Sequence, residues 1–209
     1  MAPDLFPDTL ALPGLTHLPG FAMPQEAGLV RAALGVAALA PFRRMKTPGG
    51  KAMSAAMTNC GDAGWVSDAC GYRYARQDPL SGEPWPEMPE IFRNLARHAA
   101  EAGGFPDFQP DMALINCYEP GAKMSLHQDI DEQDFLAPIV SISLGLPAIF
   151  LWGGLSRAEK PVRLPVNSGD VLVWGGAARK IFHGIAPVKA GEHPLTGAAR
   201  LNLTFRRAL

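Results

Sequence analysis

The stretch RLNLTFR, residues 200–206, alternates polar and apolar side chains without exception. Successive side chains of an extended strand point to opposite faces, so the polar residues from Arg200 to Arg206 share one face. Two arginines that face a protein interior need anionic partners, because burial of an unpaired charge is very unfavourable. The stretch therefore predicts a strand that carries an anion site. The alternative is a half-exposed edge strand with a polar outer face.

Five other short runs in the C-terminal half have the composition of β-strands, and Gly, Pro and Asn separate them. Many short strands without intervening helices favour a double-sheet jelly roll over a parallel α/β sheet. The runs are residues 113–118, 138–144, 148–152, 170–174 and 181–185. We expect a mainly β protein with flanking helices.

The N-terminal half predicts an arm and two helices. Residues 1–22 are rich in Pro and Gly and predict an irregular arm, whereas residues 24–40 and 89–102 have helical spacing of apolar residues. The expected buried faces are Leu29, Val30, Ala33 and Leu34 in the first helix, and Ile91, Leu95 and His98 or Ala99 in the second.

Composition indicates one compact globular domain. Of 209 residues, 47% are hydrophobic and 19% are charged, which excludes a disordered or fibrous protein. The formal net charge of −1 does not indicate a nucleic-acid-binding protein, so such binding would need a local basic patch.

Location is predicted from the cysteines and from the absence of targeting patterns. Cys60, Cys70 and Cys117 cannot all pair within one chain, so free thiols are expected. The N-terminus has no signal-peptide pattern, and residues 23–40 are too short and too interrupted by charge to span a membrane. We expect a cytoplasmic protein.

A histidine and an aspartate form an H-x-D step at His127 and Asp129, and His183 follows 54 residues after Asp129. Residues two apart in an extended chain project to the same side, and His183 is expected to reach them from a facing sheet. Two histidines and one carboxylate leave positions on a metal open, as in non-heme Fe(II) oxygenases. The alternative is a histidine hydrogen-bonded beside a loop aspartate, which is the interpretation for His17, His98 and His193.

The arginine pair suggests the ligand that accompanies the metal. A dicarboxylate supplies two anionic groups, and the planar guanidinium of Arg binds a carboxylate through two parallel hydrogen bonds. Asn116 and Tyr118 occupy alternate positions of another strand and can donate hydrogen bonds to the same ligand.

These motifs together resemble the AlkB family of nucleic-acid dioxygenases through most of residues 41–207. The resembling stretches are MTNCG (57–61), GWVSDACGYRY (64–74), DFQPDMALINCYEPGAKMSLHQDIDE (107–132), APIVSISLGLPAIF (137–150), GDVLVWGG (169–176) and RLNLTFR (200–206). The resemblance implies a double-stranded β-helix, or jelly roll, with an N-terminal nucleotide-recognition lid. It implies a single domain in which about residues 1–106 form the arm, helices and lid, and about residues 107–209 form the catalytic core.

The resemblance also implies a site and an activity. Fe(II) would be held by His127, Asp129 and His183, and 2-oxoglutarate by Asn116, Tyr118, Arg200, Asn202 and Arg206, with Arg206 nearer the metal. O2 would be the second cosubstrate. The implied reaction is oxidative demethylation of N1-methyladenine and N3-methylcytosine in DNA or RNA, with succinate and formaldehyde as products. Single-stranded DNA and a monomeric enzyme are expected. Ile130 and Leu151-Trp152 depart from the family pattern at positions that ligate nothing.

Candidate substrate residues lie mostly between the first helix and the H-x-D step. An enzyme that acts on a base must take it out of the stack, and Trp65 could stack on that base opposite the His127 ring. Asp131 or Glu132 could neutralise a cationic methylated ring. The remaining candidates are Met57, Tyr72, Tyr74 and Arg157 for the base, and Arg43, Arg44, Lys46, Lys51, Arg73, Arg76 and Arg157 for phosphates. The alternatives are an aromatic core cluster, a solvated acidic turn and an ordinary basic surface.

Three other functions remain open at this point. The iron enzyme could act on a small molecule or a protein side chain, which the near-neutral charge permits. A non-catalytic jelly-roll module has no use for both the triad and two inward arginines. A zinc hydrolase would need a general base and would not need a dicarboxylate site.

Overall fold

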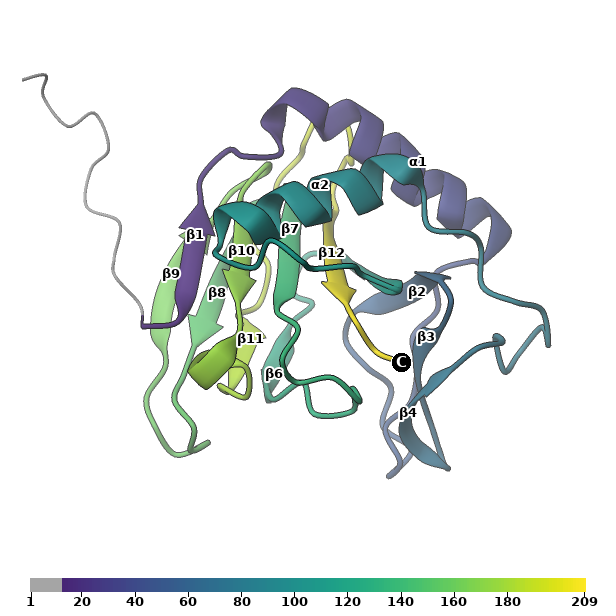
Figure 1. Ribbon diagram of the computed structural model, residues 1–209. Helices are drawn as coiled ribbons and strands as arrows, with labels where there is room; N and C mark the ends of the chain where they lie inside the picture. Colours follow the sequence, from purple (N-terminus) through teal and green to yellow (C-terminus); the bar gives the residue numbers. More distant parts are fainter. Residues whose placement is uncertain (1–12) are drawn as a thin grey trace, which may run out of the picture.

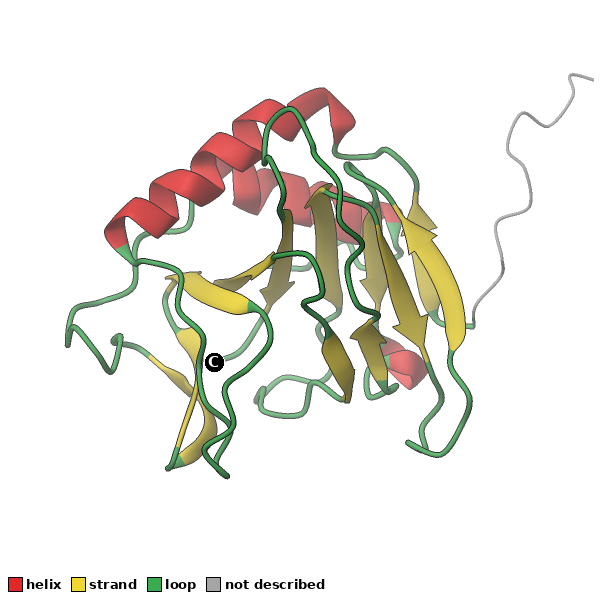
Figure 2. Cartoon of the chain, turned by 180° about the vertical axis from the view of Figure 1, so that it is seen from behind, coloured by secondary structure: helices red, strands yellow, loops and turns green. Residues whose placement is uncertain are grey.

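The computed structural model describes residues 13–209. Its centre is a pair of β-sheets, and two helices lie across the outer face of the larger sheet (Figures 1 and 2). The larger sheet has six strands in the order β1-β10-β7-β12-β5-β2, and the smaller has four in the order β6-β11-β8-β9. Strands β3 and β4 form a separate hairpin.

All of the strands predicted for the C-terminal half are present, with bounds within two residues of those expected. The larger sheet contains β1 (Leu15–Leu18), β2 (Ala56–Gly61), β5 (Met112–Tyr118), β7 (Ile139–Gly145), β10 (Val171–Trp174) and β12 (Arg200–Arg206). The smaller sheet contains β6 (Met124–His127), β8 (Ala148–Trp152), β9 (Val162–Val166) and β11 (His183–Ile185), and the hairpin contains β3 (Gly64–Asp68) and β4 (Gly71–Ala75). Strands β1 to β4, β6 and β9 have no counterpart among the predicted runs.

Strand β12 lies between β7 and β5, which excludes the edge-strand alternative. Its apolar face joins the helices in one core cluster, where Phe205 packs edge-on against Phe92 of the second helix with ring centroids 5.9 Å apart. Its polar face is also buried and points toward the smaller sheet. The alternation of the sequence thus separates an apolar outer core from an inner face that carries charge.

The two predicted helices are present as α1 (Glu26–Leu39) and α2 (Glu90–Ala102), with a short 3-10 turn, η1 (Met23–Gln25), before α1. The predicted face of α1 is wrong at Leu34, which is 51% exposed, because the helix turns Val36 to the core in its place. In α2 the buried face is centred nearer Phe92 than the expected face was. His98 is therefore exposed, while Leu95 and Ala99 are buried as expected.

The prediction of an irregular arm is wrong for residues 15–18. This segment forms β1 and pairs antiparallel with β10, where it supplies hydrogen-bond partners to an edge of the larger sheet that would otherwise be open. The first part of the predicted arm, residues 1–12, lies outside the described residues.

Cys60, Cys70 and Cys117 are free thiols, as the sequence led us to expect. Among residues 13–209, no helix combines the length and apolar character needed to cross a membrane.

Candidate active site

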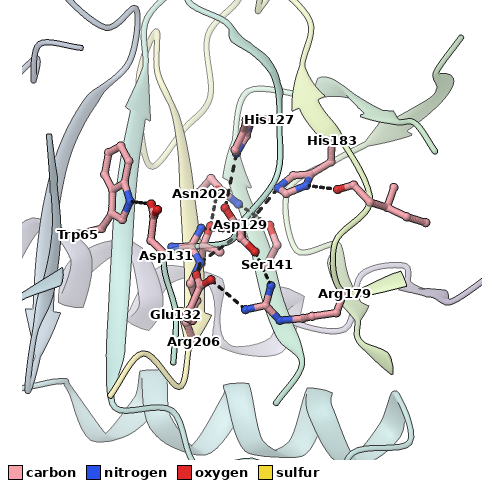
Figure 3. A network of polar contacts seen from close by, with 12 residues as sticks. Trp65, His127, Asp129, Asp131, Glu132, Ser141, Arg179, His183, Asn202 and Arg206 are labelled. Atoms are coloured by element: carbon pink, nitrogen blue, oxygen red, sulfur yellow. Dashed lines mark hydrogen bonds and ion pairs between the residues drawn. The ribbon is translucent and has the colours of Figure 1, made fainter. Parts of the chain in front are cut away.

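The candidate metal ligands come together where β6 and β11 pair. His127 and His183 are register partners in these antiparallel strands, and Asp129 follows two residues after the end of β6. The potential ligand atoms of the three residues lie within 4.8 Å of one another (Figure 3). The expectation that His183 reaches the site from a facing sheet is wrong, because both histidines belong to the smaller sheet.

Backbone carbonyls orient both imidazole rings. Nδ1 of His127 lies 2.9 Å from the Ser125 carbonyl oxygen, and Nδ1 of His183 lies 3.1 Å from that of Ile181. Because a carbonyl only accepts hydrogen bonds, Nδ1 carries the proton and the lone pair of each Nε2 remains free for a metal. The Nε2 atoms lie 3.8 and 3.7 Å from the Asp129 carboxylate oxygens, for His127 and His183 respectively.

The electrostatics of the triad suit a divalent cation. Burial and the neighbouring His127 lower the pKa of His183 to about 4, so its ring is neutral at physiological pH. Burial alone would raise the pKa of Asp129, but Arg206 and the two histidines hold it below its usual range and keep the carboxylate ionised. Two imidazoles and one carboxylate form the ligand set of non-heme Fe(II) sites.

The polar face of β12 carries the candidate cosubstrate residues. Arg200 is 1% exposed, and its Nη2 donates to the Ser143 hydroxyl at 3.0 Å while its guanidinium lies over the Tyr118 ring. Its Nε and Nη1 have no hydrogen-bond partner among the described residues. Nη1 of Arg206 and Oδ1 of Asn116 are likewise buried without a partner.

Buried polar atoms without partners are costly and rare in proteins, so this group of three donors and one acceptor points to a ligand site. The free N–H groups belong to two guanidiniums, which suit a ligand with two carboxylates. A dicarboxylate such as 2-oxoglutarate therefore fits the residues that are present. Burial lowers the pKa of Arg200, and an anionic partner would oppose that effect.

Asn202 differs from its neighbours because its hydrogen-bonding groups have partners within the protein. Its amide donates to the Ser141 hydroxyl at 2.8 Å and to the Ile142 carbonyl at 3.0 Å, while its Oδ1 accepts from Thr204 at 3.0 Å and from Asn116 at 3.4 Å. Asn202 thus orients Asn116 and has no group left over for a ligand.

The β3–β4 hairpin presents aromatic side chains on one face. Register pairs Trp65 with Tyr74 and Ser67 with Tyr72, so all four share that face. The Trp65 and Tyr72 rings stack with centroids 5.6 Å apart, and Trp65 Nε1 donates to Asp131 at 2.8 Å. Tyr72 is 48% exposed and lies outside the core, whereas Trp65 and Tyr74 are half-buried and pack against the core cluster, as the alternative of an aromatic core cluster expected for them.

Two expected substrate residues are buried. Met57 is 1% exposed and lies opposite Asn116 in the β2–β5 pairing, so it packs beside the cosubstrate residues and has no surface open to a base. The Glu132 side chain is 1% exposed and contacts Tyr74, Arg206 and Arg179. Both alternatives for Glu132, a base-reading carboxylate and a solvated turn, are wrong, because these donors hold it inside the protein. Asp131 is exposed and is the acidic residue available to a base.

Several expected phosphate contacts are engaged within the protein. Arg43, Arg44 and Arg73 form ion pairs with Asp78, Glu119 and Asp68 respectively. Arg157 donates to the Leu126 carbonyl next to His127 and lies over the Phe182 ring. Lys46, Lys51 and Arg76 are exposed, and no carboxylate of residues 13–209 forms an ion pair with them.

Sequence reasoning missed residues that complete the site. Ser141 and Ser143 sit at alternate positions of the apolar strand β7 and face Asn202 and Arg200, a pattern that could have revealed them. Arg179 follows a 3-10 turn, η2 (Gly176–Ala178), and is 3% exposed. It donates to the carbonyls of Asp129 and Ala137, and nothing in its local sequence signals that role.

Comparison with known proteins agrees with this geometry. The family model described as the 2OG-Fe(II) oxygenase superfamily matches residues 14–206. The alpha-ketoglutarate-dependent dioxygenase AlkB of Escherichia coli (strain K12) is 56% identical over 195 residues, which cover 93% of this chain and 90% of that protein. The human nucleic acid dioxygenase ALKBH1 is 33% identical over 125 residues, which cover 59% of this chain and 32% of that protein. The solved structure of OsALKBH1 matches with a TM-score of 0.85 at 30% identity, over 96% of this chain and all of the other.

Proposed function

Because the chain belongs to the AlkB family of the 2OG-Fe(II) oxygenase superfamily, we propose that it demethylates alkylated nucleic-acid bases by oxidation and so repairs DNA by direct reversal. The protein is an Fe(II)- and 2-oxoglutarate-dependent dioxygenase. The proposed substrates are N1-methyladenine and N3-methylcytosine in DNA, with single strands preferred and RNA as a further substrate. When bound, iron with 2-oxoglutarate and O2 supplies the chemistry that hydroxylates a methyl group, which then leaves as formaldehyde.

His127, Asp129 and His183 are the proposed iron ligands. The Ser125 and Ile181 carbonyls hold both rings in the tautomer whose Nε2 can ligate. Arg206 donates to Oδ2 of Asp129 through Nη2 at 2.8 Å and thereby keeps that carboxylate oriented and ionised.

Arg200, Arg206, Asn116 and Tyr118 are the proposed 2-oxoglutarate contacts, and Asn202 supports them. Arg206 forms an ion pair with Asp129, a proposed metal ligand. It is therefore the arginine that we assign to the 2-oxoglutarate carboxylate nearer the iron. Arg200 lies at the other end of β12, where its unpartnered Nε and Nη1 can donate hydrogen bonds to the distal carboxylate of 2-oxoglutarate. Hydrogen bonds from the buried, unpartnered N–H groups of the two arginines to the ligand would be the physical source of the binding free energy.

One observation supports the proposed class of substrate. The indole of Trp65 donates a hydrogen bond to the Asp131 carboxylate, and both side chains lie beside the triad. An aromatic plane next to a negative charge suits a flat ring that is itself cationic, as N1-methyladenine and N3-methylcytosine are. A base stacked on Trp65 would gain roughly 1–3 kcal/mol. The exposed Tyr72 ring and Arg157 extend this surface, and Lys46, Lys51 and Arg76 are candidates for phosphate contacts.

We propose that residues 1–209 act as one domain, a monomer in the cytoplasm, with the β3–β4 hairpin as the nucleotide-recognition lid. Strands β1 and β2 join the larger sheet, so the N-terminal half contributes to the jelly roll as well as to the lid.

A direct assay tests the proposed function. The protein is incubated with Fe(II), ascorbate, 2-oxoglutarate and an oligonucleotide that contains one N1-methyladenine, and the oligonucleotide mass is measured. We expect loss of one methylene equivalent together with stoichiometric succinate and formaldehyde. Succinate formation that small metabolites stimulate and methylated oligonucleotides do not would favour the small-molecule alternative. Absence of any 2-oxoglutarate turnover with iron present would favour a binding module.

A further inference from the structure

A buried network of two acids and two arginines lies beneath the triad. Glu132 Oε1 lies 3.1 Å from Arg206 Nε, and Glu132 Oε2 lies 3.2 Å from Arg179 Nη2. Arg206 in turn donates to Asp129, and Arg179 donates to the Asp129 carbonyl at 2.9 Å (Figure 3). The formal charges of these four side chains balance, and in the interior such a network persists only while each charge keeps its partners.

One neutral donor enters the network from another part of the fold. The Tyr74 hydroxyl, on β4 of the hairpin, donates to Oε1 of Glu132 at 2.7 Å. Burial raises the pKa of Tyr74, so the hydroxyl stays protonated and can donate. The same Glu132 oxygen thus receives one hydrogen from the hairpin and lies 3.1 Å from Nε of Arg206.

The position of Glu132 therefore affects two groups at once. Arg206 donates to Asp129 through Nε and Nη2, and its Nε also lies 3.1 Å from Glu132. Its Nη1 has no hydrogen-bond partner among the described residues and is the group left for a ligand. We expect a movement of β4 to displace the Tyr74 hydroxyl and with it Oε1 of Glu132, and we expect that displacement to reorient the Arg206 guanidinium. Trp65 pairs with Tyr74 in the hairpin, so a ligand that stacks on Trp65 acts on the same element.

We propose that Glu132 is a positioning residue that couples the β3–β4 hairpin to the cosubstrate site, so that nucleic acid at the hairpin and 2-oxoglutarate at Arg206 strengthen each other's binding. The proposal rests on the proposed function, because it assigns nucleic-acid binding to the hairpin. Coupling between two sites is reciprocal, so it can be read from either ligand.

The test measures binding without turnover. The dissociation constant of 2-oxoglutarate is measured anaerobically on the Fe(II)-loaded protein, with and without a saturating N1-methyladenine oligonucleotide. For the unmodified protein we expect the oligonucleotide to tighten 2-oxoglutarate binding by about fivefold or more. Tyr74→Phe removes only the hydroxyl that reaches Glu132, and we expect it to reduce that effect to less than about twofold.

Two further variants separate coupling from general disturbance. Glu132→Gln keeps the size of the side chain but loses its charge, and we expect weaker 2-oxoglutarate binding even without oligonucleotide. Asp68→Asn is the matched control, because it breaks the Arg73 ion pair on the opposite face of the same hairpin and leaves Tyr74 untouched. This control should keep the full oligonucleotide effect.

Three results would overturn the proposal: no oligonucleotide effect in the unmodified protein, an undiminished effect in Tyr74→Phe, or equal loss in Asp68→Asn. Demethylation of the same oligonucleotide, followed by mass in parallel, reports the proposed function separately. Demethylation without any coupling would therefore reject the role of Glu132 and leave the function standing.

Discussion

His127 and His183 are paired across the antiparallel strands β6 and β11, and their ring centroids lie 4.4 Å apart. Directly opposite residues of an antiparallel pair project to the same face, so the strand pairing itself brings the two imidazoles together. The loop after β6 then needs to deliver only Asp129 to complete a facial set of ligands.

The pairing predicts the effect of removing one ligand. His127→Ala should abolish 2-oxoglutarate turnover and weaken Fe(II) binding by more than the roughly 10–100-fold that loss of an outer-shell partner costs. The His127 side chain is partly exposed, so the variant should keep its far-UV circular dichroism and much of its stability. Asp129→Ala and His183→Ala should lose turnover as well, as measured by succinate release. Substantial activity in all three variants would refute the triad.

Arg206→Lys tests the geometry of the guanidinium. Lysine keeps the charge but cannot bridge Asp129 and Glu132 while also offering a free N–H to a ligand. We expect 2-oxoglutarate affinity to fall about tenfold or more, which corresponds to ~1.4 kcal/mol. The exposed neighbour Arg207 provides the matched control, and Arg207→Lys should leave the affinity unchanged. Equal affinities for both variants and the unmodified protein would remove Arg206 from the site.

Arg200 should stabilise the protein only when its ligand is present. Its buried Nε and Nη1 have no partner among residues 13–209, and each such group costs about 1–3 kcal/mol. We expect 2-oxoglutarate at 100 times its dissociation constant to add about 2.7 kcal/mol to the free energy of unfolding. Arg200→Met should lose this gain while its ligand-free melting temperature does not fall. The measurement is thermal unfolding across a 2-oxoglutarate titration, and a large ligand-free loss in the variant would contradict the account.

Asp131→Asn should reduce discrimination between cationic and neutral lesions. Asparagine keeps an oxygen that can accept from Trp65 Nε1, so the indole stays oriented while the charge is lost. Near a protein surface a charge pair at about 4 Å interacts by roughly 4 kcal/mol before desolvation, so a net difference of ~1.4 kcal/mol, or tenfold, is reasonable.

The readout is the ratio of kcat/KM for N1-methyladenine and N3-methylthymine oligonucleotides, measured at fixed salt because phosphate contacts depend on ionic strength. Asp134→Asn, in the same loop but paired with Arg207, is the control. An equal fall in kcat/KM on both substrates would show that Asp131 maintains the shape of the site. An unchanged kcat/KM on both would show that Asp131 belongs to a solvated acidic turn without a role in substrate binding.

The sequence by itself determined the features that depend on local pattern. The alternation at residues 200–206 assigned the arginines and the leucines to opposite faces, and both assignments hold. Turn residues delimited the strands of the C-terminal half, and the H-x-D step with His183 identified the residues that meet at β6 and β11. The predicted jelly roll with flanking helices is confirmed.

Only the tertiary structure decided features that depend on which distant segments meet. Asp131 and Glu132 are adjacent acids, yet one is exposed beside Trp65 and the other is enclosed by Tyr74, Arg206 and Arg179. Periodicity states which side of a strand a residue faces, but it does not name the neighbouring strand or the donor across the interior. The partner of Asp131 is 66 positions away and the hydroxyl that donates to Glu132 is 58 positions away, and only the packing of these segments fixes the burial and the hydrogen bonds that give each carboxylate its role.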